Sequence, residues 1–134
     1  MRFFTPKEAD AALEVVRPLV ERLVRLRREL VRAGGELGAV RSTVAGNGGR
    51  LDPERVGQLE KTAERAAAEL AGVVEELDGF GVQVKDLDRG LIDFPARHPA
   101  SGETVLLCWE LGEASVEHWH GLEDGYAGRK PLPF

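Results

Sequence analysis

The sequence predicts an α+β fold: a long antiparallel two-helix hairpin packed on a small antiparallel β-sheet of about three strands. Two observations support this prediction. Before residue 79 there are two capped segments in which apolar residues recur every three or four positions, as on one face of a helix. After residue 79 the apolar residues alternate with polar ones or form short runs between turn residues, which is typical of strands.

The first helix is predicted over residues 6–34. Thr5 and Glu8 have the spacing of a capping box, and Pro6 occupies the first helical position, where a missing N–H costs little. Pro18 is expected to kink or divide the helix, and Gly34 with the glycine after it to end the helix. The apolar stripe of this helix and the flank that widens it comprise Leu13, Val16, Val20, Leu23 and Leu30, with Val15, Leu19 and Leu26.

The second helix is predicted over residues 52–78, with Asp52 as its N-cap, Pro53 as its first residue and Gly79 as its end. Its apolar residues form a narrow seam that suits antiparallel packing on another helix. Residues 35–51 are rich in glycine, so they are predicted to be a flexible connection. The first helix is basic and the second acidic, which favours their pairing.

Residues 79–134 are predicted to form a small β-rich region and a tail. Three short strands are expected, near residues 82–84, at 91–94 and at 104–109, with turns between them. Residues 115–120 fit either a short helix or a fourth strand. We expect the strands to cover the wide apolar flank of the first helix, so that residues 1–134 make a single domain.

Composition limits the class of protein. The chain has 134 residues, of which 43% are hydrophobic, and a net charge of −5. This apolar fraction excludes a disordered chain, and no apolar run is long enough to span a membrane. The charged N-terminus does not fit a signal peptide, so we expect a cytoplasmic protein with no membrane partner. The acidic balance argues against nucleic acid as a partner.

The densest cluster of potential ligands lies between residues 108 and 120. On a strand, His118 and His120 share a face, and Glu113 or Asp93 can complete the ligand set of a divalent metal ion. On a helix the two histidines would point apart, and no established zinc motif has this spacing. The alternative without a metal places both histidines at the surface or in structural hydrogen bonds.

Two further residues, Cys108 and Arg129, are candidate functional groups. Cys108 lies inside an apolar run, which predicts a small inert side chain with a raised thiol pKa and excludes an internal disulfide, since it is the one cysteine. Arg129 follows a glycine-rich turn and either holds an anion or belongs to a solvated basic tail. There is no dinucleotide fingerprint, P-loop or Gly-x-Ser-x-Gly, so the common nucleotide-dependent classes are excluded and no organic cofactor is predicted.

Several short motifs spread over nearly the whole chain together resemble the uncharacterised bacterial domain-of-unknown-function family 2203. They are Phe3-Phe4-Thr5-x-x-Glu8-Ala9, Gly81-Val82-x-Val84-Lys85-Asp86, Gly90-Leu91-Ile92-Asp93-Phe94-Pro95, Leu107-Cys108-Trp109-x-x-Gly112-Glu113, Trp119-His120 and Gly125-x-x-Gly128-Arg129. The family has no assigned activity to carry over. The resemblance does direct attention to the motif residues Glu8, Asp86, Asp93, Glu113, His120 and Arg129, and away from His118.

We therefore expect a non-catalytic cytosolic interaction protein that self-associates through its helical hairpin. The wide apolar arc of the first helix and the opposite charge of the second favour a homo-oligomer, with a dimer preferred. The alternative is a metal or small-molecule site, enzymatic or not, built from Glu113, His120 and Asp93. The sequence does not decide whether the protein is an enzyme.

Overall fold

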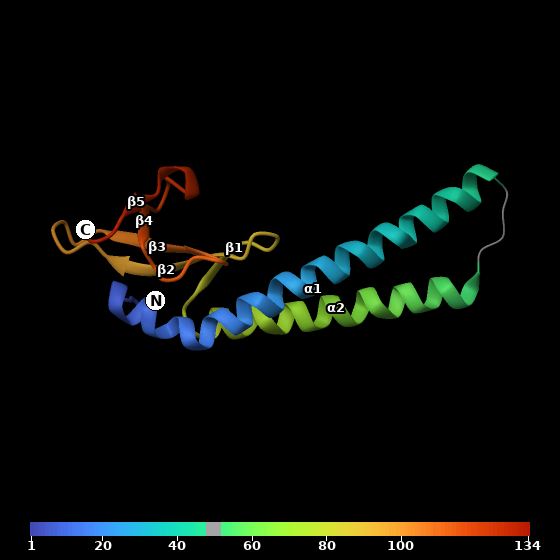
Figure 1. Ribbon diagram of the computed structural model, residues 1–134, viewed down its shortest axis with the longest axis horizontal. Helices are drawn as coiled ribbons and strands as arrows, with labels where there is room; N and C mark the ends of the chain where they lie inside the picture. The colour runs from blue at the N-terminus through green and yellow to red at the C-terminus, as the bar shows by residue number, and fades with distance from the viewer. Residues whose placement is uncertain (48–51) are drawn as a thin grey trace. The chain divides into compact units, whose positions relative to one another are not determined.

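The computed structural model describes residues 1–47 and 52–134. It confirms the α+β class, because two long packed helices are followed by an antiparallel sheet (Figure 1). The elements are α1 (Pro6–Asn47), α2 (Pro53–Gly79), β1 (Gln83–Asp86), β2 (Leu91–Arg97), β3 (Thr104–Glu110), β4 (His118–Gly121), the short 3-10 helix η1 (Tyr126–Gly128) and β5 (Lys130–Pro131). The sheet has five strands in the order β1-β2-β3-β4-β5, rather than about three. Residues 118–120 are therefore strand and not helix.

Both predicted helix starts are confirmed by their capping bonds. The Thr5 Oγ1 accepts a hydrogen bond from the Glu8 N–H at 3.1 Å, and the Glu8 Oε1 accepts one from the Thr5 N–H at 3.0 Å. The Asp52 Oδ1 accepts hydrogen bonds from the N–H groups of Glu54 and Arg55. Each cap satisfies helix donors that have no partner within the helix.

The end of α2 lies close to the predicted Gly79, but another glycine terminates it. Gly81 has a φ of 87°, in the left-handed region. Its N–H donates to the Asp78 carbonyl, and the next N–H, of Val82, donates to the Leu77 carbonyl. This is the bonding pattern of a Schellman motif, which turns the chain out of the helix and towards β1.

The predicted end of the first helix at residues 34–35 is wrong, and so is a flexible connection over residues 35–47. The helix α1 continues to Asn47 and includes Pro18 without being divided there. An exposed glycine inside a helix costs only about 1 kcal/mol relative to alanine. Packing and ion pairs along α2 can offset that cost. The rest of the predicted connection, residues 48–51, lies outside the described residues.

The contacts divide the chain into two compact units: residues 1–24 with 73–134, and residues 25–72. In the second unit α1 and α2 are joined by three ion pairs between residues 29–41 and 55–65, namely Glu29–Arg65, Glu36–Arg55 and Arg41–Glu60. A single domain over residues 1–134 stays a prediction. No helix of the described ranges has an apolar stretch that could cross a lipid bilayer.

In the first unit, one face of the sheet packs on the start of α1. The Phe4 ring lies 5.1 Å from the Phe94 ring in an edge-to-face arrangement. The turn at Gly90 lies against Val20 and Val24 of α1. The predicted covering of Val15 is wrong: Val15 is 51% exposed. Of the flank that was expected to be covered, Leu26 is buried and Leu19 is half-buried, so the expectation fails at Val15.

Candidate functional site

Three buried side chains with metal-ligating atoms come together on the other face of the sheet. Asp93 lies on β2, Cys108 on β3 and His120 on β4, which are adjacent antiparallel strands. Asp93 lies opposite Cys108, and His120 lies two residues after the partner of Cys108 on β4, so all three side chains share one face. One ligand atom from each lies within 4.8 Å of the other two, and all three residues are buried.

The histidine of this triad has both ring nitrogens engaged. The His120 Nδ1 lies 2.8 Å from the Gly121 carbonyl oxygen, which can only accept, so Nδ1 carries the proton. A ring with its one proton on Nδ1 has an acceptor at Nε2, and this atom lies 3.2 Å from the Asp93 Oδ1. Two acceptors that face each other in a buried site require a cation between them, which is either a proton or a metal ion.

The other two members of the triad also favour holding a proton or a metal ion. Burial raises the pKa of Asp93, although His120 and Lys85, whose Nζ lies 4.0 Å from the Asp93 Oδ2, oppose this effect. Burial also raises the pKa of Cys108 to about 12. At neutral pH the thiol therefore keeps its proton unless a metal ion displaces it.

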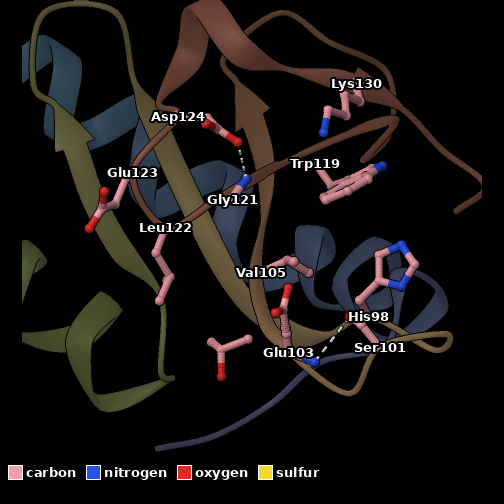
Figure 2. A pocket seen from close by; sticks show the side chains of 11 residues that line it. His98, Ser101, Glu103, Val105, Trp119, Gly121, Leu122, Glu123, Asp124 and Lys130 are labelled. Carbon is pink, nitrogen blue, oxygen red and sulfur yellow. Dashed lines mark hydrogen bonds between the residues drawn. The ribbon is translucent and has the colours of Figure 1, made fainter.

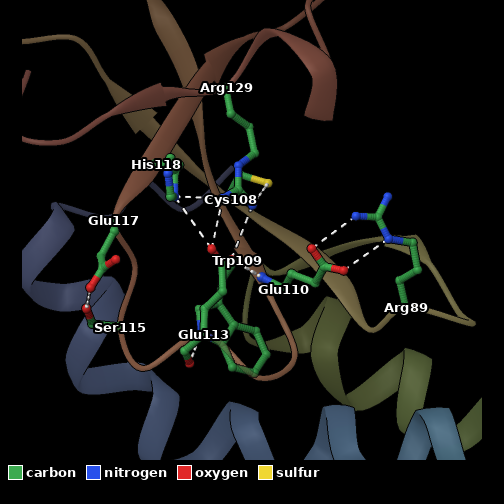
Figure 3. A network of polar contacts seen from close by, with 9 residues as sticks. All are labelled: Arg89, Cys108, Trp109, Glu110, Glu113, Ser115, Glu117, His118 and Arg129. Atoms are coloured by element: carbon green, nitrogen blue, oxygen red, sulfur yellow. Dashed lines mark hydrogen bonds and ion pairs between the residues drawn. The ribbon is translucent and has the colours of Figure 1, made fainter.

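A second polar network surrounds Arg129 (Figure 3). The guanidinium of Arg129 donates to the two carboxylate oxygens of Glu113, at 3.2 Å and 2.8 Å. Its Nη2 also donates to the His118 Nδ1 at 2.7 Å, which occupies the Nδ1 lone pair. Burial alone would raise the pKa of Glu113, but the hydrogen bonds and charge of Arg129 lower it.

The structure thus separates the residues expected to form one site. It brings Asp93 and His120 together, whereas Glu113 and His118 bind Arg129. Arg129 was expected either to hold an anion or to belong to a solvated tail, and in the structure the anion that it binds is the Glu113 carboxylate. Metal binding itself stays a prediction. Cys108 was predicted to be an inert side chain, and its place beside Asp93 and His120 follows from the pairing of β2, β3 and β4, which no local motif encodes.

Two other acidic residues of the family motifs have structural contacts. Glu8 forms the capping box of α1. The Asp86 Oδ1 accepts hydrogen bonds from the N–H groups of Asp88 and Arg89, which fixes the turn between β1 and β2. Both carboxylates are explained by local backbone geometry.

A small pocket adjoins the triad. It measures about 120 Å³ and is lined by Lys85, Leu91, Asp93, Leu106, His120, Leu122, Gly125 and Tyr126. The Tyr126 ring belongs to η1 and is contacted by two guanidinium groups, with the Arg89 Cζ 4.2 Å and the Arg129 Cζ 4.5 Å from the ring centroid. These cation–π contacts hold one wall of the pocket in place.

A wider hollow of about 860 Å³ lies beside the start of β3 and the strand β4 (Figure 2). Here the Lys130 Nζ lies 4.8 Å from the Trp119 ring centroid, and the Asp124 Oδ2 accepts a hydrogen bond from the Gly121 N–H. Glu103, Glu123 and Asp124 of its lining are exposed. The hollow therefore lacks the buried, convergent polar groups of the triad.

Comparison with known proteins gives a family but no activity. The family model described as "Uncharacterized conserved protein (DUF2203)" matches residues 2–132, nearly the whole chain. Neither the curated proteins nor the solved structures include a significant match.

Proposed function

Because the chain belongs to the uncharacterized family DUF2203, we propose a function from its geometry alone: the protein binds a divalent transition-metal ion through Asp93, Cys108 and His120. The observation that supports this most directly is the pair of facing acceptors, the His120 Nε2 and the Asp93 Oδ1, 3.2 Å apart in a buried site. The Cys108 sulfur beside them supplies a third ligand atom.

The chemistry of the donors favours zinc over magnesium or calcium. A thiolate and an imidazole are ligands that Zn²⁺ prefers, while Mg²⁺ and Ca²⁺ prefer sets made of oxygen. Two light-atom ligands at about 2.0–2.1 Å from a tetrahedral zinc are roughly 3.3 Å apart, close to the observed 3.2 Å. Loading the site would displace the proton of the Cys108 thiol and the one shared by Asp93 and His120.

Three protein ligands leave one coordination position open, as in catalytic rather than structural zinc sites. The pocket beside Asp93 and His120 supports access from solvent to that position. In such a site the metal ion supplies Lewis acidity and activates a bound water. The residues of the site also argue against His120 as a general base, because both of its ring nitrogens already have partners.

The test is metal binding by protein purified without a tag. Elemental analysis should find about one zinc or iron per chain, and isothermal titration of chelator-treated protein with Zn²⁺ should give the same stoichiometry. With Co²⁺, a thiolate charge-transfer band should appear and should be lost in Cys108→Ser. His120→Gln should weaken Zn²⁺ binding by more than about 100-fold, because even the partners of metal ligands are worth about 10- to 100-fold.

His98→Gln is the matched control, since His98 lies in the turn between β2 and β3 and outside the triad. It should leave Zn²⁺ affinity unchanged. Wild-type protein that takes up no Zn²⁺ or Fe²⁺ and gains no thermal stability from either would overturn the proposal, and would mean that a proton joins Asp93 to His120. Equal Zn²⁺ affinities in wild type, Cys108→Ser and His120→Gln would also overturn it.

A further inference from the structure

We propose that the pocket beside the triad binds a small monocarboxylate, with its carboxylate between Lys85 and the open metal position and its short chain on the leucine side chains. This inference rests on the proposed metal site and adds the chemical class of the ligand. It follows from the size of the pocket, its charge and its apolar lining.

The size of the pocket favours a small ligand. The pocket measures about 120 Å³, whereas sites for drug-sized ligands are usually about 300–1,000 Å³. An acid with a chain of a few carbons therefore matches its size better than a nucleotide or a sugar phosphate does.

The charge of the pocket favours an anion. Two of the neighbouring cations have carboxylate partners: Arg129 pairs with Glu113, and Arg89 pairs with Glu110. Lys85 faces Asp93 at 4.0 Å. When Asp93 and the Cys108 thiolate ligate a divalent ion, their two negative charges neutralise it. The Asp93 carboxylate then no longer neutralises the positive charge of Lys85, which lies beside the open coordination position. The carboxylate of a bound ligand can neutralise that charge instead.

The remaining lining decides between kinds of anion. Leu91, Leu106 and Leu122 are apolar and line the pocket together with the Tyr126 ring. Strongly hydrated inorganic phosphate would lose more hydrogen bonds to water than it gains there, since apart from Lys85 the lining side chains offer few donors. A short alkyl chain instead gains from burial, at about 25 cal/mol per Å² of apolar surface. A carboxylate with an apolar chain matches both parts of the lining.

The experiment uses the Co²⁺-loaded full chain and propionate as the probe. Propionate should change the visible ligand-field spectrum of bound Co²⁺ in a saturable way. Propionamide, which has nearly the same shape without the charge, should do so weakly or not at all, and inorganic phosphate should bind more weakly than propionate. In protein saturated with Co²⁺, Lys85→Met should lower the affinity for propionate about tenfold or more while the thiolate band stays in place.

Lys61→Met on α2 is the matched control and should bind propionate like wild type, because Lys61 lies in the other unit of the chain. If Co²⁺ binds with a thiolate band but propionate leaves the spectrum unchanged, this inference fails and the metal site stands. Tighter binding of phosphate than of propionate, or equal propionate affinity in Lys85→Met, also overturns it. If wild type binds no metal, the proposed function and this inference both fail.

Discussion

Arg129 connects two polar clusters on the same face of the sheet: its own network with Glu113 and His118, and the triad, which it reaches at Cys108. Its guanidinium binds both oxygens of Glu113 and the His118 Nδ1, and its Nη1 lies 3.9 Å from the Cys108 sulfur. Its side chain is only 11% exposed, so the Arg129–Glu113 pair is largely shielded from water. Removing one partner of such a pair costs more than the pair contributes, because the other charge is left unpaired.

At this scale we predict that Glu113→Gln lowers the free energy of unfolding by about 2 kcal/mol at pH 7. The folded-state pKa of Glu113 lies below its unfolded value. The ionised carboxylate therefore contributes stability above the unfolded pKa, near pH 4, and that contribution is lost as the pH falls through the folded pKa. The difference in the free energy of unfolding between wild type and Glu113→Gln should therefore shrink as the pH falls.

Urea unfolding at a series of pH values, with a chelator present, measures both quantities. Glu75→Gln removes an exposed carboxylate of α2 and serves as the control, for which we expect less than about 0.5 kcal/mol at any pH. A loss in Glu113→Gln that stays constant from pH 7 to pH 3 would contradict the assigned role of the Glu113 carboxylate.

At the scale of the element, the turn between β1 and β2 depends on Gly90. This glycine has a φ of 65°, and a Cβ added there would lie 2.9 Å from the Leu111 Cβ and from a methyl group of Val20. Two costs therefore add up in Gly90→Ala: the left-handed backbone, about 1–2 kcal/mol, and the overpacking, about 1–3 kcal/mol.

Gly102→Ala is the matched control for this turn. Gly102 has a φ of 73°, and a Cβ added there meets nothing within 4 Å, so only the backbone cost applies. Gly90→Ala should lower the free energy of unfolding by about 2 kcal/mol more than Gly102→Ala does. Chemical denaturation of both variants gives the comparison. Equal losses would mean that Val20 and Leu111 move aside without cost.

The elements also show which parts of the structure can be predicted from sequence. The capping box of α1 and the N-cap of α2 depend on residues within three positions of one another, so Thr5 and Asp52 could be identified from spacing alone. The end of α1 could not be identified in this way. Contacts with α2 stabilise the helix over residues 35–47 by more than its glycines destabilise it, and these contacts are not visible in the local sequence. The site was half predictable: Asp93 and His120 have suitable side chains, but Cys108 joins them only through strand pairing.

At the scale of the whole molecule, self-association remains a proposal, and the fold specifies which apolar side chains a second copy of the chain would cover. Two helices alone bury only one face each, and residues 25–72 leave several apolar side chains partly or largely exposed. Val31 is 52% exposed, and Leu30, Leu37, Val40 and Val56 are half-buried. A second copy of the chain can cover these side chains and can pair the basic face of α1 with the acidic α2.

We therefore expect a dimer in sedimentation velocity at tens of micromolar protein. Val31→Glu should shift the protein to a monomer, because a charge cannot be buried in an apolar interface without a partner. Ala68→Glu adds the same charge at an exposed position of α2 and should leave the dimer intact. Since opposite charges help to choose the partner, added salt should weaken the dimer. A wild-type monomer at this concentration would contradict self-association and would leave the metal site as the property to pursue.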